Sequence, residues 1–160
     1  MKNNIELLEE AQELLNLNQR ELGIYVGVSA RCVNAWMTGE RAVPSYVTEM
    51  ANRLAHIDAV AMAEGRPTST MARWAVIRSS GLDEFIDVYG NKADALRAAE
   101  VEWKHLTASE KKKAETFMVG MVNVQICDEP MADSRFQQAV LENGSIDADI
   151  YDVAKDYKHN

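Results

Sequence analysis

Two short helices are expected between residues 19 and 38, because turn-forming residues stand before, between and after them. Asn18 and Ser29 have side chains that cap helix N-termini by accepting a backbone hydrogen bond. Gly27 can adopt a positive φ and end the first helix, and Gly39 stops the second. The chain is therefore expected to place two short helices on either side of a tight turn.

Longer helices are expected before and after this pair. Apolar residues from Ile5 to Leu15 recur every three or four positions, so one face is buried and the glutamates between them face water. Pro44 and Ser45 open a further helix, whose apolar residues are also three and four positions apart. These residues are Val47, Met50, Leu54, Ile57 and Ala61. Two interpretations of this stripe are open: it closes the core of the N-terminal helices, or it pairs with a second copy.

The pattern changes after the segment EGRPTST, residues 64–70, which we interpret as a linker. Two β-rich runs follow it, RWAVIRSS at 73–80 and EFIDVYG at 84–90, with a loop around Gly81 between them. Short β-rich runs separated by a glycine-containing loop are typical of a hairpin. The chain is thus expected to turn from helices to a sheet at this point.

The rest of the second half alternates between helix and strand. Asn91 can cap a helix over residues 92–106, and Thr107 begins a capping box for a shorter one. The long apolar run at 117–127 predicts a strand in the centre of its sheet, and Ser145 can cap a last helix. We expect the core of this half to consist largely of Trp74, Phe85, Trp103 and Phe117.

Together these patterns predict an α+β protein in two domains. Residues 1–65 form an all-α helix-turn-helix domain. Residues 71–160 form a small ββαβ module, a sheet with helices on one face, followed by an acidic tail.

The net charge of −8 is unusual for a nucleic-acid binder, but its distribution along the chain is uneven. Residues 1–18 hold four glutamates and one lysine, a net charge of −3. Residues 128–160 hold eight acids and three bases, a net charge of −5. Residues 19–53 hold four arginines and three glutamates, a net charge of +1. The two short helices therefore lie in the N-terminal region that is not acidic.

The segment LNQRELGIYVGVSARCVNAWMTGERAVPS resembles the Cro/CI-type helix-turn-helix of phage repressors and of the wider xenobiotic-response-element regulators. The matching residues are Gln19, Leu22, Gly27, Val28, Ser29, Val33, Trp36, Gly39, Arg41 and Pro44. Gly23 departs from the family, where alanine is usual, at a cost of about 1 kcal/mol in helix propensity. Met37 departs where glutamate is common. The segment with the long helix after it is also similar to the anti-CRISPR-associated repressors, which shut down their own phage operons.

In the family that this segment resembles, the second motif helix enters the major groove. By position, the resemblance implies contacts with base edges for Ala30, Arg31, Asn34 and Ala35. It implies phosphate contacts for Gln19, Ser29, Thr38 and Arg41. Arginine pairs well with guanine and asparagine with adenine, which suits such a role. The alternative is that these residues are the solvated surface of a motif that does not bind DNA.

We therefore expect a sequence-specific transcriptional regulator, a phage or mobile-element repressor. Its partner is double-stranded DNA, which it reads over an inverted repeat as a homodimer. The C-terminal module mediates dimerisation or senses a protein partner. The alternative is an interaction protein, such as an anti-CRISPR or other host-factor inhibitor. Its acidic module would block a nucleic-acid-binding partner, and its helix-turn-helix would regulate its own gene.

Residues that could support catalysis or metal binding form no known pattern in the sequence. His56, His105 and His159 are scattered, and Cys32 and Cys127 form no CxxC pair. Nucleotide-binding, hydrolase and metalloprotease motifs are missing from the sequence. We expect neither an enzyme nor a bound cofactor.

Two further expectations concern basic residues and membranes. The lysines at 111–113 follow a capping box and are interpreted as a solvated helix face, with nucleic-acid contact as the alternative. No apolar run approaches the roughly 20 residues that span a bilayer. The N-terminal segment lacks the apolar region of a signal peptide, so we expect a cytoplasmic protein without membrane contact.

Overall fold

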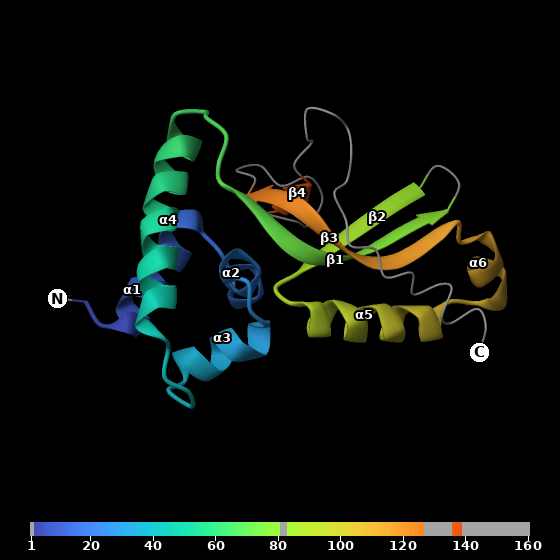
Figure 1. Ribbon diagram of the computed structural model, residues 1–160, viewed down its shortest axis with the longest axis horizontal. Coiled ribbons are helices and arrows are strands. Elements are labelled where there is room, and N and C mark those ends of the chain that lie inside the picture. Colours follow the sequence, from blue (N-terminus) through green and yellow to red (C-terminus); the bar gives the residue numbers. More distant parts are fainter. Residues whose placement is uncertain (1, 81–82, 127–135, 139–160) are drawn as a thin grey trace.

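The computed structural model describes residues 2–80, 83–126 and 136–138, without the side chains of residues 83–85, 116, 137 and 138. The N-terminal part is all helical: α1 (Asn4–Leu15), α2 (Gln19–Val26), α3 (Ala30–Met37) and α4 (Ser45–Ala63). The elements that follow are β1 (Thr70–Ser80), β2 (Asp83–Tyr89), α5 (Lys92–His105), α6 (Ala108–Lys113), β3 (Thr116–Ile126) and β4 (Phe136–Gln138). The protein is thus a mixed α+β fold with its helical part first (Figure 1).

The local signals that begin and end the short helices are confirmed. The Asn18 side chain accepts a hydrogen bond from the Glu21 N–H at 2.8 Å, and the Glu21 carboxylate accepts from the Asn18 N–H at 3.0 Å. Gly27 ends α2 in the left-handed region with a φ of 91°. The Ser29 hydroxyl accepts from the Cys32 N–H at 3.0 Å, so α3 begins where its cap predicts.

The sheet is antiparallel in the order β2-β1-β3-β4. The predicted hairpin is confirmed, with Trp74 opposite Tyr89 and Ser80 opposite Asp83. The predicted central position of the apolar run is also confirmed, because β3 lies between β1 and β4. The short strand β4 has no counterpart in the sequence prediction, and the helix predicted after Ser145 lies outside the described residues.

Helices cover both faces of the sheet, whereas the sequence predicted them on one face. On one face α5 packs with Val76 and Phe117, and the ring of Trp103 meets that of Phe117 edge to face at 5.1 Å. The alternate residues of β1, Met71 and Ala75 among them, face the N-terminal helices instead. Strands buried on both faces are expected to be apolar throughout, which explains the composition of β3.

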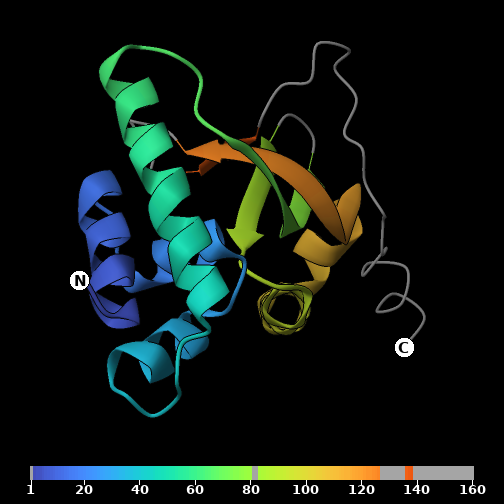
Figure 2. The ribbon, with the colours of Figure 1, turned by 60° about the vertical axis from the view of Figure 1, so that its left-hand side comes forward.

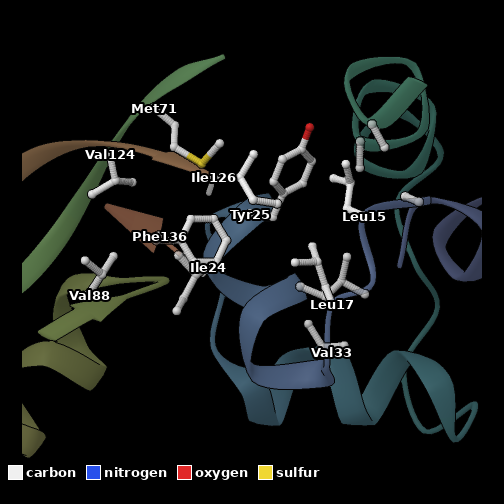
Figure 3. Close-up of a cluster of buried hydrophobic side chains, with 14 of the residues drawn as sticks. Leu15, Leu17, Ile24, Tyr25, Val33, Met71, Val88, Val124, Ile126 and Phe136 are labelled. Carbon is white, nitrogen blue, oxygen red and sulfur yellow. The ribbon is translucent and has the colours of Figure 1, made fainter. Parts of the chain in front are cut away.

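The N-terminal helices and the sheet share one hydrophobic core across the predicted domain boundary. Ile24 and Tyr25 of α2 lie between the sheet residues and the interior of the helical part (Figure 3). On the sheet side the cluster includes Met71, Val88, Val124, Ile126 and Phe136, and on the helix side Leu15, Leu17 and Val33. Residues 64–70 therefore join the helical part to the sheet, but the two parts do not have separate cores.

The long helix α4 does not bury the predicted stripe. Its buried residues are Thr48, Ala51, Ala55, Asp58 and Ala61, so mostly small side chains face α1 and the core. Of the predicted stripe, Val47 and Leu54 are half-buried and Ala61 is buried. Met50 and Ile57 are 68% and 56% exposed. The first interpretation, closure of the core by the whole stripe, is therefore wrong.

Candidate nucleic-acid interface

The helices α2 and α3 meet at a compact turn of three residues, Gly27 to Ser29. The N–H groups of Gly27 and Val28 both donate to the carbonyl oxygen of Gly23, each at 2.8 Å. The helix α3 and the loop after it form the lower end of the molecule, with α5 beside them (Figures 1 and 2). In the part of the chain that the structure describes, this arrangement leaves the outer side of α3 uncovered at one end of the protein.

Five of the eight predicted contact residues are exposed. Arg31, Asn34 and Thr38 lie on one side of α3 at helical spacing, so they share a face. Gln19, the first residue of α2, and Arg41, in the loop after α3, are exposed as well. The exposed face thus offers one guanidinium and one amide group from α3, and at its C-terminal end the Thr38 hydroxyl, which donates to the carbonyl oxygen of Ala35 at 3.4 Å.

The other three predicted contact residues are buried or half-buried. Ala35 is only 6% exposed, so it does not belong to the outer face, and its predicted contact with base edges does not fit this fold. Ala30 is half-buried and lines a small cavity against Val88 and Gly90, in the second half of the chain. Ser29 is also half-buried, and its hydroxyl oxygen is the cap of α3, which leaves its O–H able to donate.

Arg73 of β1 holds the end of α2. Its guanidinium donates to the carbonyl oxygen of Ile24 and, at 2.7 Å, to that of Tyr25. The last carbonyls of a helix have no partner within the helix, so a cation there satisfies them and complements the helix dipole. Burial lowers the pKa of Arg73, but an arginine remains charged at neutral pH. The sheet therefore fixes the position from which the turn starts.

Arg20 attaches the beginning of α2 to the same sheet. Its guanidinium donates to the carbonyl oxygen of Val88 at 3.3 Å and lies over the ring of Tyr89, 5.4 Å from the centroid. Such a cation–π contact contributes roughly 0.5–1 kcal/mol at an exposed site. Both ends of α2 are thus tied to strands, which orients α3 relative to the sheet.

Two glycines allow the backbone around the turn to pack closely. A Cβ at Gly23 would lie 2.8 Å from the carbonyl oxygen of Val28, so alanine does not fit there. A Cβ at Gly90 would lie 1.7 Å from that same oxygen. The departure of Gly23 from the family pattern therefore has a packing reason, which offsets its poor helix propensity.

Replacing Gly90 with alanine is expected to push the β2–α5 junction away from the turn. The obstacle is backbone on both sides, so no side-chain rotation relieves it, and overpacking of this kind costs about 1–3 kcal/mol. Denaturant unfolding of the variant checks the expected loss. Gly65→Ala is a comparison in which space is not the obstacle, because Gly65 has open space around it and alanine is strained there only by its φ of 68°. A Gly90→Ala chain as stable as the wild type would mean that the contact with Val28 does not limit the space at this position.

Asp58 of α4 joins three segments in the interior. It is fully buried and accepts hydrogen bonds from the Tyr25 hydroxyl at 2.5 Å and from the N–H and hydroxyl of Ser69, both at 2.8 Å. Burial, and then the hydrogen bond to Asp58, raise the pKa of Tyr25, so this phenol stays neutral and can donate. The carboxylate thereby connects α2 and α4 to the start of the sheet.

The sequence interpretation missed these supporting residues. For Arg73 a signal was present: a strand alternates its faces, and Arg73 shares the face of Met71 and Ala75, so a charge points into a core. A buried charge in such a position must have partners. For Gly90 the sequence carries no signal, because the close contact joins residues 28 and 90, far apart in the chain.

The remaining sequence candidates lie apart from α3. His56 is paired with Glu10, with 2.6 Å between Nε2 and Oε1, and His105 Nδ1 lies 2.7 Å from the carbonyl oxygen of Val101. Lys111 packs over the ring of Trp103, 5.3 Å from its centroid. Among the described residues, no cluster of three or more histidine, cysteine, aspartate or glutamate side chains could hold a metal ion.

The described helices include none with the length and apolar character needed to cross a bilayer. His159 and Cys127 lie outside the described residues, and Cys32 is a half-buried free thiol in α3.

Comparison with known proteins returned no matching family model, no matching curated protein and no matching solved structure. The resemblance to Cro/CI-type regulators therefore depends on the residues of the α2–α3 segment alone.

Proposed function

We propose that the protein is a sequence-specific DNA-binding regulator in which α2 and α3 form a helix-turn-helix and α3 enters the major groove. The observation that carries the proposal is the outer face of α3, where Arg31 and Asn34 are exposed one turn apart on a helix that follows directly on α2, and both ends of α2 are tied to the sheet. Base readout requires this combination of reach and fixed orientation.

The flanking residues fit contact with the DNA backbone. Gln19 begins α2 and Ser29 caps α3, so their amide and hydroxyl groups stand at two helix N-termini, where phosphate is favoured. Arg41 is exposed after α3 and can add a charge-assisted contact. In this proposal Thr38 is a further phosphate contact at the other end of α3. Repression is the simplest use of such a protein, because a bound protein excludes others from the same site.

The inhibitor alternative has less support. The acidic residues on which it depends are concentrated at 128–160, mostly outside the described residues. Residues 70–126 hold eight acidic and eight basic residues, a net charge of zero. The described part of this half therefore has no acidic surplus that would imitate nucleic acid.

Selection of bound duplexes from a random pool tests the proposal directly. The full chain is expected to enrich one sequence motif, with a binding constant that falls steeply as salt rises. A chain with Arg31 and Asn34 both replaced by alanine is the control and should enrich no motif. Failure of the wild-type chain to enrich any sequence would contradict the proposed function.

Arg31→Ala is expected to weaken binding to the selected duplex by about 1–3 kcal/mol and to relax one base position, as for a guanine contact. Titration of single-base variants of the duplex measures both effects. Arg66→Ala removes a comparable exposed arginine after the far end of α4, and it should change neither affinity nor base preference. A loss that is uniform over all duplexes would assign Arg31 to the phosphate backbone instead.

A further inference from the structure

The helix α4 carries a second stripe of residues, opposite its buried one. Tyr46, Met50, Ile57 and Val60 are 69%, 68%, 56% and 51% exposed, and Arg53 between them is exposed as well. We call these five residues the outer stripe. Their spacing alternates between four and three residues, which is the repeat of a helix that packs along another helix.

The outer stripe is unusual because four large side chains of α4 are exposed, whereas the fully buried side chains of the same helix are mostly small. An apolar groove of about 450 Å³ runs beside it, between α4 and the end of α2. Besides residues of the outer stripe, Tyr25, Val26, Val47, Leu54 and Arg73 are among the residues that line it. An exposed, largely apolar surface of this kind is typical of an interface.

We propose that the outer stripe is the seam of a homodimer in which the two α4 helices lie parallel, with the two-fold axis along them. The inference rests on the proposed function, because the direction of the helices follows from how two copies must face one duplex. It places the seam on α4, whereas the sequence also allows dimerisation through the C-terminal module.

The position of α3 requires the parallel arrangement. The chain enters α4 at the lower end of the molecule, next to α3, and leaves it at the upper end (Figures 1 and 2). A two-fold axis along α4 keeps both copies of α3 at the same end, where one duplex with two half-sites can reach them. An antiparallel pair would place the two α3 helices at opposite ends, and one straight duplex could not contact both.

The outer stripe is complementary to a second copy of itself. In a parallel pair in register, identical residues lie opposite each other, so each apolar side chain meets an apolar side chain. Arg53 is the exception in the middle of the stripe. Glu49 is exposed one turn earlier, so Arg53 can extend along the seam to the partner's Glu49 and avoid the partner's Arg53. A second copy of this chain can therefore bury the apolar residues of the stripe and pair Arg53 with a carboxylate.

Sedimentation of the full chain tests the seam. The wild-type chain is expected to be a dimer at micromolar concentration, and Ile57→Glu should weaken self-association at least about tenfold by placing a charge in the seam. Val101→Glu is the matched control, because Val101 on α5 is 57% exposed and Ile57 is 56% exposed. If Ile57→Glu weakens self-association no more than Val101→Glu does, the proposal is overturned.

Cysteine crosslinking tests the direction of the helices. With Cys32 and Cys127 both replaced by alanine, Met50→Cys chains should form a disulfide dimer with one another under mild oxidation. A mixture of Met50→Cys and Ile57→Cys chains should yield few mixed dimers, since these positions lie two turns apart in a parallel pair. Preferential mixed dimers would indicate an antiparallel pair and overturn the proposal.

Failure of the seam and failure of the proposed function give different results. A chain that stays monomeric at micromolar concentration and on DNA, yet enriches one duplex, overturns the seam and leaves DNA binding in place. A chain that forms the Met50→Cys dimer but enriches no duplex supports the seam and contradicts the proposed function.

Discussion

Asp58→Ala is expected to lower the free energy of unfolding by about 3–5 kcal/mol, the cost of breaking a buried charged network. The substitution leaves the buried Tyr25 hydroxyl and the half-buried Ser69 donors without their acceptor, and a buried unpaired donor costs about 1–3 kcal/mol. Denaturant unfolding measures the loss. Because Asp58 joins the helices to the first strand, the loss should appear in a single transition of the whole molecule.

Glu64→Ala is the matched control for Asp58→Ala, since Glu64 is an exposed acid at the end of the same helix. Its ion pair with Arg66 is exposed, so its removal should cost less than about 1 kcal/mol. Asp58→Asn keeps one oxygen acceptor, so its loss in the free energy of unfolding should lie between those of Asp58→Ala and Glu64→Ala. Wild-type stability of Asp58→Ala would contradict the account of a shared interior.

Trp36→Ala is expected to cost about 3–5 kcal/mol, as for other large aromatic side chains removed from a core. Trp36 is 5% exposed and belongs to the cluster that the helices share with the sheet. Trp36→Phe should cost less, because it leaves a smaller cavity. Calorimetry of both variants and the wild type measures their stabilities, which should fall from the wild type to Trp36→Phe and then to Trp36→Ala. A Trp36→Ala chain that unfolds like the wild type but no longer binds DNA would mean that Trp36 faces the ligand.

The local chain signals were sufficient to predict the short helices. Caps such as Asn18, Gly27 and Ser29 act within a few residues of themselves, so their effect can be read without the rest of the fold. The same holds for the hairpin of β1 and β2, which are neighbours in the chain. The exposure of Arg31 and Asn34 follows from the same helical periodicity.

The assignment of faces depended on contacts between distant segments and could not be predicted in the same way. Ala35 was expected on the outer face and is buried, because helical spacing does not say how far the core extends around α3. The second covered face of the sheet had a signal, since the apolar run of β3, with few polar interruptions, is typical of a strand buried on both sides. The helices that cover that face belong to the first half of the chain. A prediction of two separate domains therefore does not place them on the sheet.

The most direct test of DNA recognition by α3 is the change in backbone amide NMR signals of the full chain when the selected duplex is added. The account predicts the largest changes at Gln19, Ser29, Arg31, Asn34, Thr38 and Arg41, with little change at the buried residues of the sheet. Changes centred on the lysines of α6, or no changes at any ratio of duplex to protein, would contradict it.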